Sequence, residues 1–390
     1  MKNITLPLAT IIALSCAAST QAKGIEVGET TFSVHGFIKI DALFTEYNDG
    51  VPVAGAIDDF YIPSLVPTRA AGSTNTSEGV QFNSHAKQTR FNIGSSTVLS
   101  NGEKVKGFIE MDFGPGSATS NGEKTTNRSG VDLRHAVISY GNWKLGQTWS
   151  NALNGSAIAE TLDFFALSEG MIDTRQMQVR YTNGPLSVSL ENPETTVRLN
   201  APGPDTQADD SSVPDLIAKY GFKDNWGNVS VAAILRQLKY NDGANVDSTE
   251  SAAGISIAGR INAGGKDDIR FQITSGKGLG RYVGLGLNAD AYVDANNELA
   301  TIDQTAANIG YRHFWNETTR STIGYAIYSA DADAGAPTYN EKSQSIHANL
   351  LFSPMPKLTL GGEFIYGKLE KSNGNEGDMN RIQFSAKYTF

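Results

Sequence analysis

Cysteine is almost absent from this chain of 390 residues, which contains a single one, Cys16. A chain with one cysteine cannot form an internal disulfide, so no disulfide framework holds its fold. Histidine is also scarce, and the five histidines are scattered without the spacing of metal ligands. No Asn/His/Ser or acidic-His arrangement for hydrolysis can be placed either. We therefore expect no metal site, no cofactor and no enzymatic activity.

Long apolar runs are missing beyond the N-terminus, where nothing approaches the ~18 to 20 residues of a membrane-spanning helix. This excludes a helical membrane protein. The N-terminal stretch has Lys2, an apolar core over residues 4–18 and small residues at 20–22, a combination typical of a secretory signal peptide. We expect cleavage after Ala22, which leaves one domain over residues 23–390. The alternative is lipidation of Cys16 in the lipobox-like ALSC run at 13–16.

Basic residues are fewer than acidic residues, which gives a formal net charge of −9. No basic patch interleaved with aromatics indicates a nucleic-acid partner. Acidic residues gather at Asp205, Asp209, Asp210 and Asp215. They could bind divalent cations or bridge to lipopolysaccharide, although we favour a solvated loop.

What the chain has instead is a regular alternation of apolar and polar residues. Over residues 379–390, apolar side chains from Ile382 to Phe390 alternate with polar ones from Arg381 to Thr389. Such alternation indicates a strand with one apolar and one polar face. A soluble sandwich would cover the apolar face with a second sheet, whereas a membrane barrel would turn it to lipid. An aromatic chain end after this pattern resembles the last strand of bacterial outer-membrane proteins, so we expect recognition by the barrel-assembly machinery through Phe390.

Alternating segments recur along the chain, and we count about sixteen, an even number as in bacterial single-chain barrels. Short turns, such as NG at 101–102 and at 183–184, alternate with long polar loops, such as 48–85, 192–214 and 275–299. Aromatics including Trp143 and Trp226 lie near the turns, as expected at a membrane interface. The sequence predicts an all-β fold, a transmembrane antiparallel β-barrel with short periplasmic turns and long external loops.

The lumen face follows from parity, because residues opposite the lipid face line the channel. Basic residues dominate these inward positions, and those expected to line the channel or bind solute are Arg180, Arg90, Arg236, Arg260, Arg270, Arg312, Lys39 and Arg381, with Lys106, Lys219 and Lys387 also inward. Inward carboxylates are fewer: Asp41, Glu110, Asp112, Glu191 and Glu363. Arg134 is ambiguous, since residues 132–140 switch face and would fit a bulge. The pattern favours an anion-concentrating lumen, with Arg180 as the main candidate. Alternatively, each arginine pairs with a neighbouring carboxylate and only stiffens the wall.

The loop at 150–174 differs from the others because residues 156–167 are apolar at helix-like spacing. Its apolar members, among them Leu162 and Phe164, are too many for a solvated external loop. We expect it to fold inward as a constriction loop that contains a short helix. Its carboxylates Glu160, Asp163 and Glu169 would then face wall arginines. The alternative is packing against a neighbouring subunit.

Several motifs resemble one known family. GQTWS at 146–150, ETLDF at 160–164 and RQMQVRYT at 175–182, together with FIKID at 37–41 and LRHA at 133–136, are similar to the DcaP-like outer-membrane porins. The resemblance covers essentially the whole mature chain. It implies a trimeric porin of sixteen strands, with a constriction loop and a basic eyelet that admits small anions, notably dicarboxylates. Some members are expected to carry an N-terminal coiled coil, for which residues 23–31 leave no room.

We therefore expect a homotrimeric porin in the outer membrane of a Gram-negative bacterium, in contact with lipid and lipopolysaccharide. It would pass small hydrophilic solutes by diffusion and prefer anions. The alternatives are a structural or adhesive barrel with a plugged lumen and a non-selective general porin. Inward polar residues such as Asn92 and Gln272 favour a wet channel.

Overall fold

A computed structural model describes residues 24–52, 59–70, 72–73, 77, 79–114, 127, 129–200 and 203–390. The expected signal peptide and most of the loop at 114–130 lie outside these residues. Across the described part of the chain, no helix is both long and apolar enough to cross a membrane. The helical elements among these residues are three 3-10 turns, η2 (Pro63–Leu65), η5 (Gly155–Ala157) and η6 (Ser168–Gly170).

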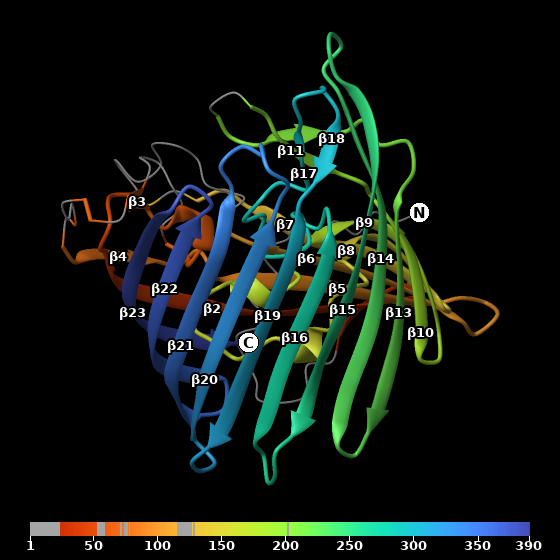
Figure 1. Ribbon diagram of the computed structural model, residues 1–390. Helices are drawn as coiled ribbons and strands as arrows, with labels where there is room; N and C mark the ends of the chain where they lie inside the picture. The colour runs from red at the N-terminus through yellow and green to blue at the C-terminus, as the bar shows by residue number, and fades with distance from the viewer. Residues whose placement is uncertain are drawn as a thin grey trace.

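One antiparallel sheet of nineteen strands closes on itself into a barrel (Figure 1). Of these strands, β1 (Ile25–Val27) and β3 (Arg69–Ala70) are short additions, and β4 (Gln81–His85) and β5 (Arg90–Val98) lie end to end against β2 (Thr30–Tyr47) as one stave. Sixteen staves result, which confirms the predicted barrel. The remaining staves are β6 (Lys104–Asp112), β7 (Asp132–Tyr140), β8 (Trp143–Trp149), β9 (Arg175–Asn183), β10 (Leu186–Glu191), β13 (Asp215–Asp224), β14 (Gly227–Asn241), β15 (Asp247–Asn262), β16 (Asp268–Lys277), β19 (Asp303–Phe314), β20 (Thr319–Asp331), β21 (Asn340–Met355), β22 (Leu358–Lys371) and β23 (Asn375–Thr389).

Closure joins the last stave to the first. β23 pairs with β2 from Phe37 opposite Thr389 to Tyr47 opposite Met379. The terminal Phe390 donates its N–H to the carbonyl oxygen of Gly36 at 3.0 Å. The alternating C-terminal segment therefore has backbone partners on both sides, and no strand edge is left open along this seam.

The connections differ at the two ends of the barrel, as the sequence predicts. Tight turns join neighbouring strands, some with positive-φ glycines such as Gly141 and Gly184. The turns between β13 and β14, β15 and β16, and β19 and β20 lie at the lower end in Figure 1. The long connections lie at the upper end. Parts of two of them, predicted as plain loops, pair into a second sheet of β11 (Thr195–Arg198), β12 (Thr206–Ala208), β17 (Ala291–Val293) and β18 (Leu299–Thr301). Residues far apart in the chain form this sheet, so local pattern could not reveal it.

The two faces of the wall follow the predicted parity. On β20, Ile323 is 59% exposed on the outside, whereas the adjacent Thr322 is 4% exposed on the inside. A wall that is apolar outside and polar inside suits lipid on one face and water on the other. The suspected bulge is also present: β6 pairs Glu110 with His135 and Met111 with Leu133, which skips Arg134 and turns it inward.

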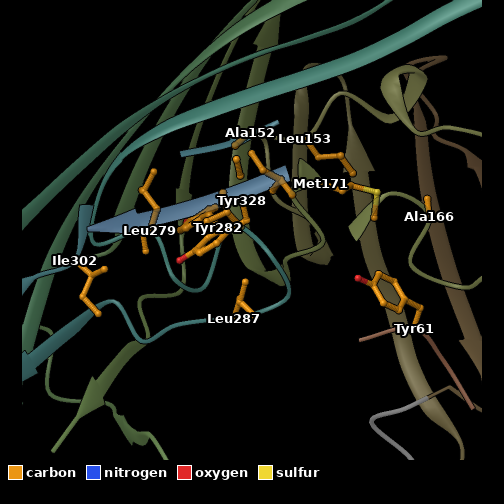
Figure 2. Packing of buried hydrophobic residues seen from close by; sticks show 14 of the residues in the cluster. Tyr61, Ala152, Leu153, Ala166, Met171, Leu279, Tyr282, Leu287, Ile302 and Tyr328 are labelled. Carbon is orange, nitrogen blue, oxygen red and sulfur yellow. The ribbon is translucent and has the colours of Figure 1, made fainter. Parts of the chain in front are cut away.

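The upper lumen holds more chain than the sequence predicts. Besides the loop at 150–174, the described segments 59–67 and 278–290 also pack inside the ring of strands. Figure 2 shows Tyr61, Met171, Tyr282 and Leu287 from these three segments gathered with Tyr328 of β20 in one buried cluster. Both additional segments were predicted as external loops. Their apolar residues are interspersed with glycine and polar residues and give no clear period.

Candidate functional site: the lumen and its constriction loop

The constriction loop (residues 150–174) enters the barrel as predicted but without the predicted helix over 156–167. Only η5 and η6 are regular. The barrel wall takes the backbone groups that a helix would have used: the Glu363 carboxylate accepts from the N–H of Leu162 at 2.7 Å and of Asp163 at 3.2 Å. Since the wall already satisfies these buried backbone groups, the loop does not need helical hydrogen bonds and keeps an irregular conformation.

Wall cations hold the carbonyl groups of this loop. Lys219 donates to Leu153 O at 2.9 Å, Arg270 to Ile158 O at 2.5 Å, and Lys39 to Leu162 O at 2.8 Å. These donors come from β13, β16 and β2, so the loop follows the wall around much of the barrel. Part of the basic lumen face thus fixes the loop in place.

The strongest attachment is at Glu160. Its carboxylate accepts from Arg312 at 2.9 Å and from Arg320, side-on, at 2.6 to 3.0 Å. Burial raises the pKa of Glu160, but the hydrogen bonds and charges of the two arginines outweigh it and lower the pKa to about 2. Arg320 of β20 was not among the inward cations predicted from the sequence. Arg312 also pairs with Asp268 at 2.5 Å.

Glycines in the wall provide room for the apolar side chains of the loop. A Cβ on Gly324 would lie 2.7 Å from the Leu167 side chain, and one on Gly361 would lie 3.2 Å from that of Leu162. A side chain at either wall position would therefore force the facing loop leucine to shift. The close approach explains the buried state of Leu162 and Leu167, which are 6% and 1% exposed.

Near its tip the loop meets a second charged cluster. Phe164 lies against the guanidinium groups of Arg90 and Arg134, at 5.8 and 5.2 Å from its ring centroid. Arg134 bonds Glu110 at 3.0 Å and Asp112 at 2.7 Å, and Arg90 bonds the same two carboxylates at 3.5 and 3.2 Å. Both arginines are therefore largely neutralised by the wall.

Asp163 and Glu169 of the loop accept hydrogen bonds that hold neighbouring segments in place. Asp163 accepts the N–H groups of Tyr61 and Phe165, each at 2.9 Å, and lies 4.0 Å from buried Arg381. Glu169 accepts the hydroxyls of Tyr61 at 2.6 Å and Ser345 at 2.7 Å. The expectation that Glu169 faces a wall arginine is wrong. Hydroxyl groups solvate this buried carboxylate instead.

Arg236 is inward but fully buried. Its guanidinium bonds Asp215 at 3.0 Å, Asp290 at 2.5 Å and the carbonyl of Gly278 at 2.7 Å. Asp290 and Gly278 belong to the inward segment 278–290, so Arg236 fixes that segment to the wall. Because its side chain has no exposed surface, it does not line the lumen.

Six further lumen cations lie within a few residues of the short turns or of the chain end and form no ion pair with a carboxylate among the described residues. Arg180 donates to Gln178 Oε1 at 2.8 Å and to Trp149 O at 2.6 Å, both neutral. Arg260 is half-buried and has only Asn262 Oδ1, at 3.4 Å, as a hydrogen-bond partner in the described chain. Lys387 lies 5.4 Å from the centroid of the Phe37 ring. We call Lys106, Lys144, Arg180, Lys219, Arg260 and Lys387 the periplasmic-half cations.

A comparison with known protein families identifies the family to which this barrel belongs. The family model of the DcaP outer membrane protein matches residues 3–390. The chain belongs to the DcaP outer membrane protein family. Membership places the barrel in the outer membrane. Comparison with curated proteins finds no match.

Solved structures agree with the family assignment. The outer membrane channel DcaP of Acinetobacter baumannii is similar at a TM-score of 0.78 and 25% identity, over 94% of this chain and 100% of that one. The anion-selective porin of Comamonas acidovorans has a TM-score of 0.55 at 12% identity, over 93% and 100% of the two chains. The trimer form of OmpT from Vibrio cholerae has a TM-score of 0.53 at 10% identity, over 93% and 99%. The last two show the shared porin fold.

No group of three or more His, Cys, Asp or Glu side chains in the described part of this DcaP-family barrel could hold a metal ion. Its charged groups instead form two populations. One population is paired with carboxylates, and several of its members, among them Arg236 and Arg312, hold inward segments in place, whereas the periplasmic-half cations form no ion pair with a carboxylate among the described residues. Sequence parity placed most members of both populations inward but missed Lys144 and Arg320. It could not separate the two populations, because the pairing depends on where the loops fold.

Proposed function

We propose that this protein is a diffusion porin that prefers small anions, and that the periplasmic-half cations carry the preference. The observation behind it is the imbalance of charge in that part of the lumen. Lys144, Arg180 and Arg260 form no ion pair with any carboxylate among the described residues. Two carboxylates of that region, Asp268 and Glu160, are already bound by Arg270, Arg312 and Arg320. Unpaired cations in a narrow aqueous pore raise the local concentration of anions.

Dicarboxylates are the solutes we propose, in line with the family resemblance. The lumen already contains an example of carboxylate recognition, because Arg320 binds Glu160 side-on with both Nε and a terminal nitrogen. Two separated guanidinium groups of this kind would each take one end of a dicarboxylate. Binding must remain weak, since a tightly held solute would block the channel.

Liposome swelling tests the proposal. Liposomes that contain the protein should swell faster in a small carboxylate than in a neutral solute or an organic cation of equal size. Equal swelling in all three would indicate a non-selective porin. No swelling in any would indicate a plugged barrel, the alternative favoured by the three segments packed in the upper lumen.

Residues 1–22 are proposed to be a cleaved signal peptide, so that export precedes insertion. We also propose a homotrimer in contact with lipid and lipopolysaccharide, inserted by the assembly machinery through the strand ending at Phe390. The trimer form of OmpT supports that assembly for this fold. Chemical cross-linking of the protein in outer membranes tests it, with a trimer band expected and a monomer alone contradicting it.

A further inference from the structure

Cations face each other across adjacent strands at three places in the described lumen. The strand register sets Lys144 opposite Arg180, Arg260 opposite Arg270, and Lys39 opposite Lys387. Directly opposed residues have Cα atoms about 4.5 to 5.5 Å apart, and like charges at such positions are destabilising. Each pair therefore requires a counter-charge or costs stability.

Two of the three pairs have an internal counter-ion. Lys39 binds Asp41 at 2.7 Å, and Arg270 binds Asp268 at 2.8 Å. Lys144 and Arg180 form no ion pair among the described residues, and the charge of Glu191 reaches Arg180 only at longer range. The two partners of Arg180 are neutral oxygens, and within the described part of the chain Lys144 has no hydrogen-bond partner.

A third cation adds to the imbalance. Lys219 on β13 lies opposite Ser187, on the strand next to Arg180, and the charges of Arg180 and Lys144 both repel its ammonium group. The nearby carboxylate, Glu191, is bonded to the N–H of Asn151 and the hydroxyl of Ser189, each at 2.7 Å. Three cations thus share one region of the wall with one engaged carboxylate.

The free donors favour one shape of anion. A carboxylate is planar and is bound best by the side-on edge of a guanidinium, which includes Nε. In Arg180 that Nε is already used by Gln178. What remains are one terminal nitrogen of Arg180 and the ammonium groups of Lys144 and Lys219, which approach from three strands. Such donors suit oxygens that point in several directions from a doubly charged centre.

We infer that Lys144, Arg180 and Lys219 form a binding site for a tetrahedral oxoanion of the phosphate type. The site lies directly below the start of the constriction loop, since Arg180 bonds Trp149 O and Lys219 bonds Leu153 O. A solute that passes the loop therefore meets it next. This inference rests on the proposed anion-preferring channel and adds a second class of solute to the dicarboxylates proposed above.

Single-channel recording with inorganic phosphate and succinate tests the site, because both are dianions at pH 8. Phosphate should block chloride current at lower concentration than succinate does. Lys144→Gln should weaken the phosphate block by about tenfold, the loss expected for one charge-assisted hydrogen bond, and should leave the succinate block nearly unchanged. Lys106→Gln is the matched control: Lys106 lies on the same face beyond Ser139 and loses the same charge outside the site.

The outcomes separate this inference from the proposed function. If the wild-type channel prefers cations or does not conduct, the proposed function fails and the site fails with it. If the channel prefers anions but phosphate and succinate block equally, or Lys144→Gln and Lys106→Gln behave alike, only the oxoanion site is overturned. Chloride currents through both variants verify that each has folded.

Discussion

At the scale of residues, the lumen combines carboxylates that stay charged with one that titrates near neutral pH. Glu160 is held charged by Arg312 and Arg320, and its pKa of about 2 keeps it so at every pH above about 4. Asp173, at the end of the constriction loop, differs. Burial raises its pKa to about 6, although Arg175, Arg134 and Arg90 nearby favour the charged form.

Titration of Asp173 should therefore make the anion preference of the channel depend on pH. As pH falls from 7 to 5 its carboxylate takes up a proton and the lumen gains positive charge, so anion preference should increase with a midpoint near pH 6. Reversal potentials measured across this range check it. Asp173→Asn should abolish the step and keep the low-pH preference at all pH values. A step that persists in the variant would assign the titration to another group.

Glu160→Gln should raise anion preference and increase fluctuation of the open current. The variant leaves Arg312 and Arg320 charged in the lumen and weakens their hold on the constriction loop. Single-channel recording measures both effects. Glu317→Gln is the control, because Glu317 is an exposed partner of Lys266 at a short turn outside the lumen. Equal behaviour of the two variants would mean that Glu160 does not hold the loop.

At the scale of elements, the fit of the constriction loop against the wall decides the width of the lumen. Gly170 in η6 lies against the backbone of Ala307 on β19 so closely that a Cβ would overlap it, whereas a Cβ on Gly155 in η5 would meet nothing. Gly170→Ala should displace the loop and change the conductance. Gly155→Ala should not. Unchanged conductance in both would contradict the observed seating of the loop.

The sequence predicted the staves well and the interior poorly, for a physical reason. Each barrel strand is specified locally by the alternation of apolar and polar residues, as in β23. Even the bulge at Arg134 can be recognised in the sequence, because the alternation switches face there. The position of an inward segment depends on partners distant in the chain, such as Tyr61 with Glu169. The helix predicted over 156–167 is absent for the same reason. The carboxylate of Glu363 on β22 accepts the backbone N–H groups of Leu162 and Asp163, which a helix would have bonded within the loop.

At the scale of the whole molecule, the account depends on lipid outside and water inside the barrel. Ile93 and Asn92 are neighbours on β5 with opposite faces, and Ile93 is 39% exposed. Ile93→Lys should destabilise the barrel by about 2 to 4 kcal/mol and reduce its assembly, the cost of a lysine facing the bilayer midplane. Asn92→Lys should assemble normally. The amount of heat-resistant folded protein in outer membranes measures both, and equal yields would contradict the assignment of faces.

The most direct test of the central claim is the reversal potential of the wild-type channel under a KCl gradient. The periplasmic-half cations predict a potential whose sign reports chloride preference, and Arg180→Ala should move it toward zero because an unpaired lumen charge is lost. A potential that reports potassium preference in the wild type would contradict the account. The acidic external loops, rather than the lumen cations, would then set the field.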